Sequence, residues 1–266
     1  MAATVWKGYI SFGLVSFPVR LTAAARPKGI HFHMLHKTDL SRIKEVLYCA
    51  EEDKPITRAD IVKGHETGKG EYVVVTDEEL KKIAPPTATT MEILQFVAAD
   101  EVDPLYLESS YYVAPEETVS KPYTLLLQAM EETNYFAVAK IAMHAREHIV
   151  ILRPGEGRLV LHTMYFADEL NRANAPEKSR AKFTGKEADL AKTLIKSLAA
   201  PFKPEQFHDE YRQNVEKLLD AKQRGRGVKS VAQPRPKPVV NILEALQKSL
   251  KQTAKAPAAK KRRRAA

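Results

Sequence analysis

Residues 6–21 of the chain read WKGYISFGLVSFPVRL. Apolar residues occupy even positions up to Leu14, and odd positions from Phe17 onward. Alternation with a period of two is typical of a half-buried β-strand, and a change of phase requires a bulge, a bend or a restart. We expect two short strands that meet near Val15. Since Pro18 cannot donate a ladder hydrogen bond, we expect the second strand at an edge or beside a bulge, as at the corner of a barrel.

Short strands recur along the next part of the chain. Each candidate is rich in β-branched and aromatic residues and is bounded by turn-forming residues. They span residues 30–35, 71–75, 91–97, 111–114, 135–143, 149–152 and 159–164. Counting all the pieces gives about seven or eight strands with few helices among them. The fold class predicted is therefore mixed but mainly β, with an antiparallel β-barrel as the core.

Capping boxes and apolar stripes mark the helices. Thr76 with Glu79, and Thr184 with Glu187, each have the Thr-x-x-Glu spacing of a capping box. Residues 120–132 carry apolar side chains at helical spacing, and this helix would cover one side of the sheet. Two further stripes, within residues 190–198 and 207–219, predict a helical arm after the barrel.

Composition excludes several classes of protein. The 266 residues contain no apolar run near the roughly 20 residues that cross a bilayer. The N-terminus lacks a basic region followed by an apolar one, so we expect no signal peptide. A single cysteine, Cys49, excludes an intrachain disulfide and a multi-cysteine zinc site. We expect a soluble protein of the cytoplasm, associated with the nucleoid if it binds DNA.

The net charge of +9 is concentrated at the C-terminus. Residues 221–266 hold 14 Lys and Arg against the single acid Glu244, whereas residues 1–220 hold 28 basic and 32 acidic side chains. A mildly acidic body with a strongly basic tail is a common pattern in proteins that bind nucleic acids. Any DNA surface on the body must therefore gather its basic residues on one side.

Within the tail, alternating prolines at 234, 236 and 238 predict an extended linker. Residues 241–250 form a short amphipathic segment, with Asn241 as its N-cap and Glu244 at the third helical position. About three helical turns are unstable in isolation, so we expect this segment to fold against a partner. Its candidate partner-binding residues are Ile242, Leu243, Leu246 and Leu250.

One pattern suggests an enzyme. Residues 144–148 read HAREH, which fits the H-x-x-E-H motif of inverted zinc peptidases, with His144, Glu147 and His148 as the site. That chemistry needs both imidazoles on one helical face, and the β-branched run that follows argues against a helix. His31 and His33 lack an obvious third ligand. We expect no catalytic residue, no metal and no cofactor.

The opening stretch also resembles a known family. Trp6, Gly8, Ile10, residues 12–15 and residues 18–19 are similar to the first signature of the bacterial Ku proteins. Arg42 with Ile43, Lys63 with Gly64, and residues 207–211 continue the resemblance. It implies a homodimeric ring that threads onto broken ends of double-stranded DNA and recruits an ATP-dependent end-joining ligase. Two alternatives remain open: a non-threading protein that compacts DNA through its tail, and the zinc peptidase.

The resemblance also implies a domain plan. The barrel core would span residues 1–170 with a DNA-encircling bridge at about 36–70, the helical arm 171–222, and a disordered basic tail 223–266. The candidate DNA-binding residues of the ring are Arg26, Lys28, Lys37, Arg42, Lys44, Lys63 and Lys69. Those of the tail are Arg224, Arg226, Lys229, Lys260, Lys261, Arg262, Arg263 and Arg264.

Overall fold

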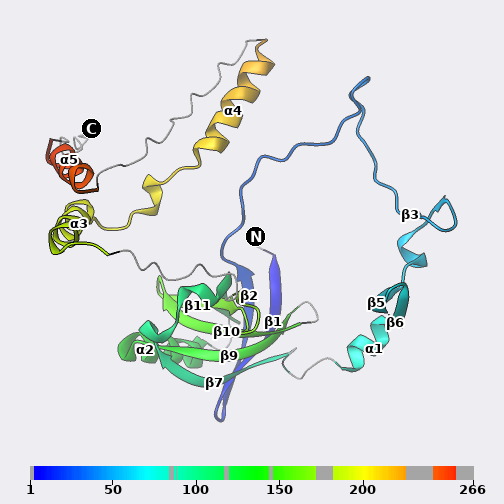
Figure 1. The fold of residues 1–266 in the computed structure, drawn as a ribbon. Helices are drawn as coiled ribbons and strands as arrows, with labels where there is room; N and C mark the ends of the chain where they lie inside the picture. Colours follow the sequence, from blue (N-terminus) through cyan, green and yellow to red (C-terminus); the bar gives the residue numbers. More distant parts are fainter. Residues whose placement is uncertain are drawn as a thin grey trace, which may run out of the picture. The chain divides into compact units, whose positions relative to one another are not determined.

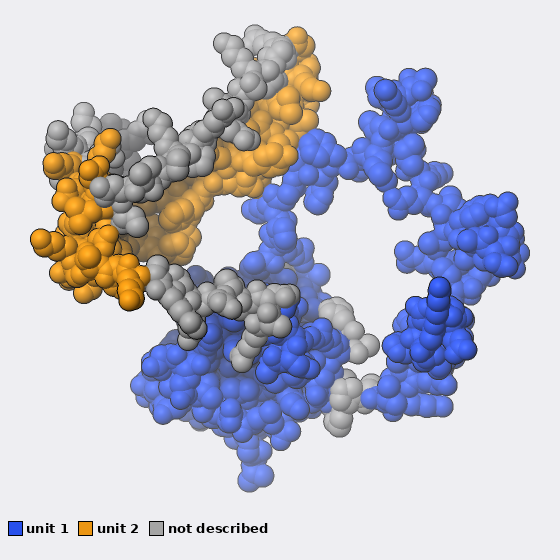
Figure 2. Space-filling view, in the orientation of Figure 1, with its two compact units in different colours: residues 1–175 blue, residues 176–266 orange. Residues whose placement is uncertain are grey.

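The computed structural model describes residues 3–83, 87, 89–116, 120–143, 146–171, 182–225 and 242–255. The chain divides into two compact units, residues 1–175 and residues 176–266 (Figure 2).

Seven strands of the first unit close into a barrel, in the order β1-β2-β8-β11-β10-β9-β7 (Figure 1). The predicted barrel is thus confirmed, although β1 and β7 pair in parallel while the other neighbours are antiparallel. The strands are β1 (Thr4–Phe12), β2 (Val15–Ala23), β7 (Thr90–Ala98), β8 (Leu107–Pro115), β9 (Tyr135–Met143), β10 (Arg146–Gly155) and β11 (Arg158–Met164).

The change of phase in the opening stretch is a tight hairpin. Phe12 pairs with Val15 across a turn in which Gly13 has a φ of 57°, a left-handed conformation that glycine adopts without a steric penalty. Ile10 then pairs with Phe17, so even positions of β1 and odd positions of β2 face the same side. Leu14 lies in the turn and is fully exposed, so its expected place on the apolar face is wrong.

Pro18 does not lie on an edge strand, because β2 sits between β1 and β8. The position is nevertheless tolerant of proline. Pro18 pairs with Tyr9 of β1. The backbone N–H of Tyr9 points away from β2 and donates to the carbonyl of Thr89 at 3.0 Å, so at this pair the backbone groups of Pro18 point toward β8 and not toward β1. The β2–β8 register begins at Val19, and the Pro18 carbonyl accepts from the Glu116 N–H at 3.2 Å. The missing donor therefore falls at the end of a ladder.

The inward side chains of the strands and helix α2 (Ser120–Thr133) form the core. Tyr123 carries a polar group into it, and its ring meets Phe17 edge to face, with the centroids 6.5 Å apart. Its hydroxyl donates to the carbonyl of Val113 at 2.9 Å and accepts from the N–H of Leu159 at 2.8 Å. This hydroxyl ties α2 to β8 and β11, and burial raises its pKa.

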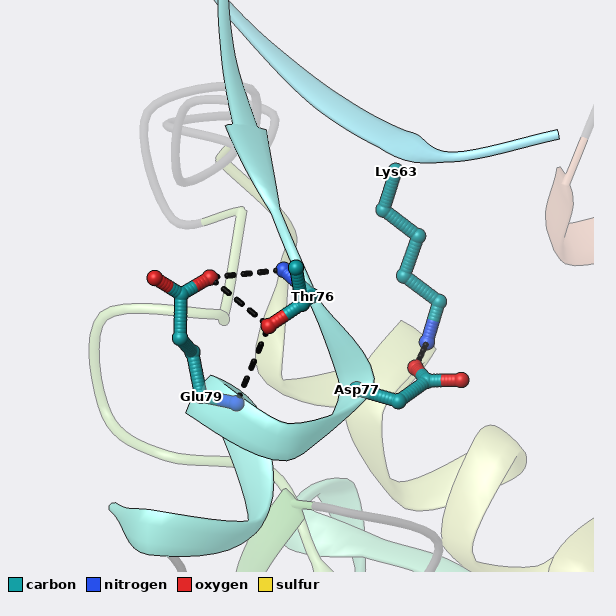
Figure 3. Close-up of polar contacts among 4 residues, drawn as sticks. All are labelled: Lys63, Thr76, Asp77 and Glu79. Carbon is teal, nitrogen blue, oxygen red and sulfur yellow. Dashed lines mark hydrogen bonds and ion pairs between the residues drawn. The ribbon is translucent and has the colours of Figure 1, made fainter.

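Residues 24–89 leave the barrel after β2 and return at β7. Their described part holds β3 (Tyr48–Cys49), β4 (Lys54–Pro55), β5 (Lys63–Gly68), β6 (Glu71–Val75), the 3-10 turn η1 (Arg58–Asp60) and α1 (Asp77–Lys82). The N-cap Thr76 and Glu79 form the expected capping box, with Glu79 N–H to Thr76 Oγ1 at 3.2 Å (Figure 3). The strand expected at residues 30–35 is wrong, since only the isolated bridge between Leu35 and Arg42 forms there.

The 3-10 turns η3 (Ala99–Glu101) and η4 (Pro104–Tyr106) join β7 to β8. In the second unit, the described elements are α3 (Gly185–Leu198), η6 (Pro204–Gln206), α4 (Glu210–Gln223) and α5 (Ile242–Lys255). The second capping box, Thr184 with Glu187, is confirmed at the start of α3. Helices α3 and α5 pack against each other. Among the described helices, none has both the length and the apolar character needed to span a bilayer.

Candidate nucleic-acid interface

The segment that leaves the barrel, residues 24–89, is called the excursion. Its first part, residues 24–44, is called the first limb. It carries five basic side chains against the single acid Asp39. Hydrogen bonds from Ser41 and His36 hold the pKa of Asp39 below its usual value. Within the described part of the chain, no ion pair involves the limb's basic residues, and all five are exposed. They are Arg26, Lys28, Lys37, Arg42 and Lys44.

The rest of the excursion has the opposite balance. Residues 45–89 hold six basic and ten acidic side chains. Lys63 forms an ion pair with Asp77, with Nζ and Oδ1 2.8 Å apart, and this hydrogen bond lowers the pKa of Asp77 (Figure 3). Lys69 is exposed near the turn between β5 and β6 and has no ion-pair partner within the described residues. Of the two predicted DNA-binding residues here, only Lys69 therefore offers an uncompensated charge.

The barrel adds basic residues that the sequence analysis missed. Lys7 and Arg20 face each other across β1 and β2, and Arg20 is exposed between two fully buried neighbours. Arg158 likewise precedes the buried Leu159 on β11, so its side chain points outward. With Arg153, these residues form what we call the barrel basic face. The period-2 rule would have found it, because each lies out of phase with its apolar neighbours.

The charges of this face are not equally available. Lys7 forms an ion pair with Glu116, with Nζ and Oε1 2.6 Å apart, and this contact raises the pKa of the lysine. Within the described residues, neither Arg20 nor Arg158 forms an ion pair. Arg20 and Arg158 are therefore exposed cations without a carboxylate partner among the described residues, and the half-buried Arg153 has no ion-pair partner there either.

Contacts within the sheet hold two arginines of this face. The guanidinium of Arg158 lies over the ring of Tyr112, 5.1 Å from its centroid. Arg153 donates from Nε to Nε2 of His162 at 2.8 Å and from a terminal nitrogen to the carbonyl of Pro154 at 3.1 Å. A Cβ on Gly155 would lie 2.9 Å from the Arg153 guanidinium, so glycine leaves room for that side chain.

His162 is buried and links Arg153 to Ser110. Its Nδ1 lies 2.9 Å from Ser110 Oγ. Because Nε2 accepts from Arg153, Nδ1 carries the proton of the neutral ring and donates it to the serine. Burial, and then the charge of Arg153, lower the pKa of His162. A serine that accepts from its histidine is not activated as a nucleophile, so this network orients Arg153 and provides no acyl-transfer site.

Little of the predicted tail site falls within the described residues. Arg224 is exposed at the C-cap of α4. Arg226, Lys229 and residues 260–264 lie outside the described residues, so their role stays a prediction. On α5, Leu243, Leu246 and Leu250 are half-buried, and the side chain of Ile242 lies outside the description. The helix packs on α3, so the candidate partner-binding face already has a neighbour within the chain.

The metal motif does not form a site in the described part of the chain. His144 lies outside the described residues, whereas Glu147 and His148 are consecutive on β10 and so face opposite sides of the sheet. Glu147 accepts from Thr87 Oγ1 at 3.1 Å and lies 3.6 Å from Lys140 Nζ. Among the described His, Cys, Asp and Glu residues, no group of three or more could hold a metal ion.

Comparison with known proteins agrees with this architecture. The family model described as the Ku70/Ku80 beta-barrel domain matches residues 11–190. The SPOC domain of human PHD-finger protein 3 superposes on 61% of this chain and 95% of its own, at 14% identity. Its TM-score is 0.29, too low to support an argument.

Three relatives are called non-homologous end joining protein Ku. That of Solibacter usitatus is 61% identical over 94% of both chains. That of Koribacter versatilis is 49% identical over 94% of this chain and 86% of its own. That of Archaeoglobus fulgidus is 39% identical over 94% of this chain and 98% of its own. Because the match includes both the barrel and nearly the whole length of these relatives, the chain belongs to the Ku family.

Proposed function

We propose that this protein binds the ends of double-stranded DNA without reading their sequence, as a ring-shaped homodimer in non-homologous end joining. The observation that carries the proposal is the set of uncompensated cations on the first limb and the barrel basic face, in a chain whose relatives are named for end joining. Lys and Arg without carboxylate partners can contact phosphates whatever the bases are. The protein would act at the chromosome, in the cytoplasm, and not as an enzyme.

Exposed apolar side chains support a second copy as the partner. Phe32, Leu40, Val46 and Val62 are 65–69% exposed on the excursion, whereas large apolar residues are usually buried. Burial of each would contribute about 1.5–3 kcal/mol, so a protein partner that covers them would bind well. A ring would form if the excursion of one copy packed against a second copy. Homodimerisation would therefore account for both the ring and the exposed apolar side chains.

The dimer is testable by sedimentation of the full chain. A Leu40→Glu, Val62→Glu double variant is expected to shift the mass from dimer toward monomer, because two charges would enter an apolar interface. Thr67→Glu is the matched control on an exposed position of the same excursion. A wild-type chain that sediments as a monomer at micromolar concentration would contradict the homodimer.

Threading is testable by topology. The full chain is bound to linear DNA and to covalently closed circular DNA of equal length, with competitor present. Retention on linear DNA after both ends are blocked, without retention on the closed circle, is the expected result. Equal retention on both forms would refute a ring and favour binding through the basic tail alone.

Recruitment of an ATP-dependent end-joining ligase is the further part of the proposal, with α5 as the candidate contact. Its apolar residues are half-buried on α3, so the ligase would replace α3 or bind the composite surface of both helices. Leu246→Glu is expected to abolish capture of the purified ligase, whereas Lys248→Glu on the exposed side of α5 is the control. Undiminished capture by Leu246→Glu would remove α5 from the contact.

A further inference from the structure

An uncharged side chain holds Arg153 on the barrel basic face. Arg153 of β10 pairs with Val160 of β11, and His162 is the next residue of β11 on the same face. Nε of the arginine lies 2.8 Å from Nε2 of His162, and a terminal nitrogen lies 3.1 Å from the carbonyl oxygen of Pro154. His162 is 8% exposed, whereas Arg153 is only half-buried. The guanidinium is therefore held by the protein and still partly open to solvent.

Arg153 keeps donors for a ligand. A guanidinium has five N–H groups. The contacts with His162 and Pro154 use two of them, which leaves three. Among the described residues, no ion pair involves Arg153. A planar cation with free N–H donors matches the geometry of a phosphate group.

The neutrality of the partner matters, because a carboxylate would hold the arginine and also cancel its charge. Lys7 is an example on the same face, since its Nζ lies 2.6 Å from Oε1 of Glu116. His162 differs from that carboxylate. Burial, and then the charge of Arg153, lower the pKa of His162, so its ring is uncharged near pH 7. Arg153 is thus held in place with its positive charge intact.

Ser110 on β8 supports the contact from the other side of the ring. It pairs with His162 across β8 and β11, and its Oγ lies 2.9 Å from Nδ1. With the proton of the neutral ring on Nδ1, Nε2 has a lone pair for the N–H of Arg153. Three strands therefore contribute one residue each to a chain of hydrogen bonds that ends at the guanidinium.

We propose that His162 is a positioning residue for DNA binding, which holds the guanidinium of Arg153 for contact with a backbone phosphate. The inference rests on the proposed function, because it takes the barrel basic face as part of the DNA interface. A mobile arginine loses rotamer freedom when it binds a ligand, and this loss lowers affinity. Arg153 is already ordered before DNA arrives, so its contact with a phosphate forms with a smaller entropy loss.

The test compares two amides at position 162 in the full chain. His162→Gln keeps an acceptor near the position of Nε2 and should keep the contact with Arg153. His162→Asn is shorter and places its amide near the position of Nδ1, so it can contact Ser110 but not Arg153. Fluorescence anisotropy with a blunt duplex, between about 50 and 200 mM salt, gives the affinity and the slope of log K against log salt.

His162→Asn is expected to bind about two- to tenfold more weakly, because Arg153 must then be ordered on binding. The slope should not change, because the charge of Arg153 is retained. His162→Gln should bind as the wild-type chain does. This rescue distinguishes positioning of Arg153 from a general effect of changing a buried residue.

Two variants at position 153 separate positioning from charge. Arg153→Ala removes the phosphate contact and should lower the slope by about 0.9, and in that background His162→Asn should have no further effect. Arg153→Lys keeps the charge without the Nε–H group, so it should match His162→Asn in affinity and slope. Because it changes the half-buried member of the pair, it also serves if His162→Asn does not fold, which circular dichroism would reveal.

The results that contradict positioning differ from those that contradict end binding. Wild-type affinity in Arg153→Lys or in folded His162→Asn would overturn the proposal. So would equal losses in His162→Gln and His162→Asn, or the same loss from His162→Asn with and without Arg153. Equal binding by the wild-type chain and Arg153→Ala would overturn it too and leave end binding intact. A wild-type chain that does not bind the duplex would refute the proposed function itself.

Discussion

Replacing Arg20 and Arg158 by alanine is expected to weaken binding to a blunt duplex by a calculable amount. Both guanidinium groups are exposed on the outward side of the barrel, and neither has a carboxylate partner within the described residues. Removal of one phosphate contact lowers the slope of log K against log salt by about 0.9. At about 0.1 M salt this is roughly eightfold in affinity for each contact, so the double variant should bind about 60-fold more weakly.

The assay is fluorescence anisotropy with an end-labelled duplex, repeated between about 50 and 200 mM salt so that slope and affinity are obtained together. Arg158→Lys keeps the charge and should keep the slope, even though it weakens the contact with the ring of Tyr112. Arg212→Ala is the control for removal of a charge elsewhere, because Arg212 is paired with Glu216 at 3.0 Å on α4. An unchanged slope in the double variant would refute the assignment of the barrel basic face to the DNA interface.

Three other predictions concern stability. Tyr123→Phe should destabilise the fold by about 1–3 kcal/mol in urea unfolding, because the Leu159 N–H and the Val113 carbonyl are both deprived of their buried partner; no change would show that these groups bind elsewhere. The pKa of His162 is lowered in the folded chain, so below the ordinary value of 6.5 the unfolded state binds more protons than the folded state. The melting temperature should therefore fall as the pH decreases below 6.5, and it should fall less in the His162→Gln variant. Thr184→Ala should reduce the stability of helix α3 by about 1 kcal/mol because it removes the N-cap side chain. The measurement is the loss of helical circular dichroism, compared with the control variant Thr193→Ala at an exposed position of the same helix.

The local sequence pattern was sufficient to predict the barrel strands and the starts of the capped helices. Inward residues such as Ile10, Phe17 and Leu161 are buried at the positions that the period of two indicates. Thr76 and Thr184 begin helices because their side chains satisfy free N–H groups, an effect that depends only on residues three positions away. The pattern failed at residues 30–35, where alternation is present but no strand among the described residues pairs with the segment beyond the single bridge between Leu35 and Arg42.

The role of the candidate DNA-binding residues stays a prediction, but the structure shows which of their charges have an ion-pair partner among the described residues. The charges of Arg26, Lys28 and Arg42 are visible in the sequence, but whether a charge is free depends on what folds beside it. Lys63 is neutralised by Asp77, 14 positions away, and no local rule predicts that pairing. Conversely, the period of two points Arg20 outward, but only the pairing of β2 with β8 and of β8 with β11 brings it onto the same face as Arg158.

By itself, the sequence determined the class of fold, the segregation of charge into the tail and the family resemblance, because periodicity, capping and composition are local or additive properties. Only the tertiary structure decided which strands close the barrel and which of the described cations lack an ion-pair partner. These depend on contacts between residues far apart in the chain, and the free energy of such contacts is set by geometry that no single segment contains.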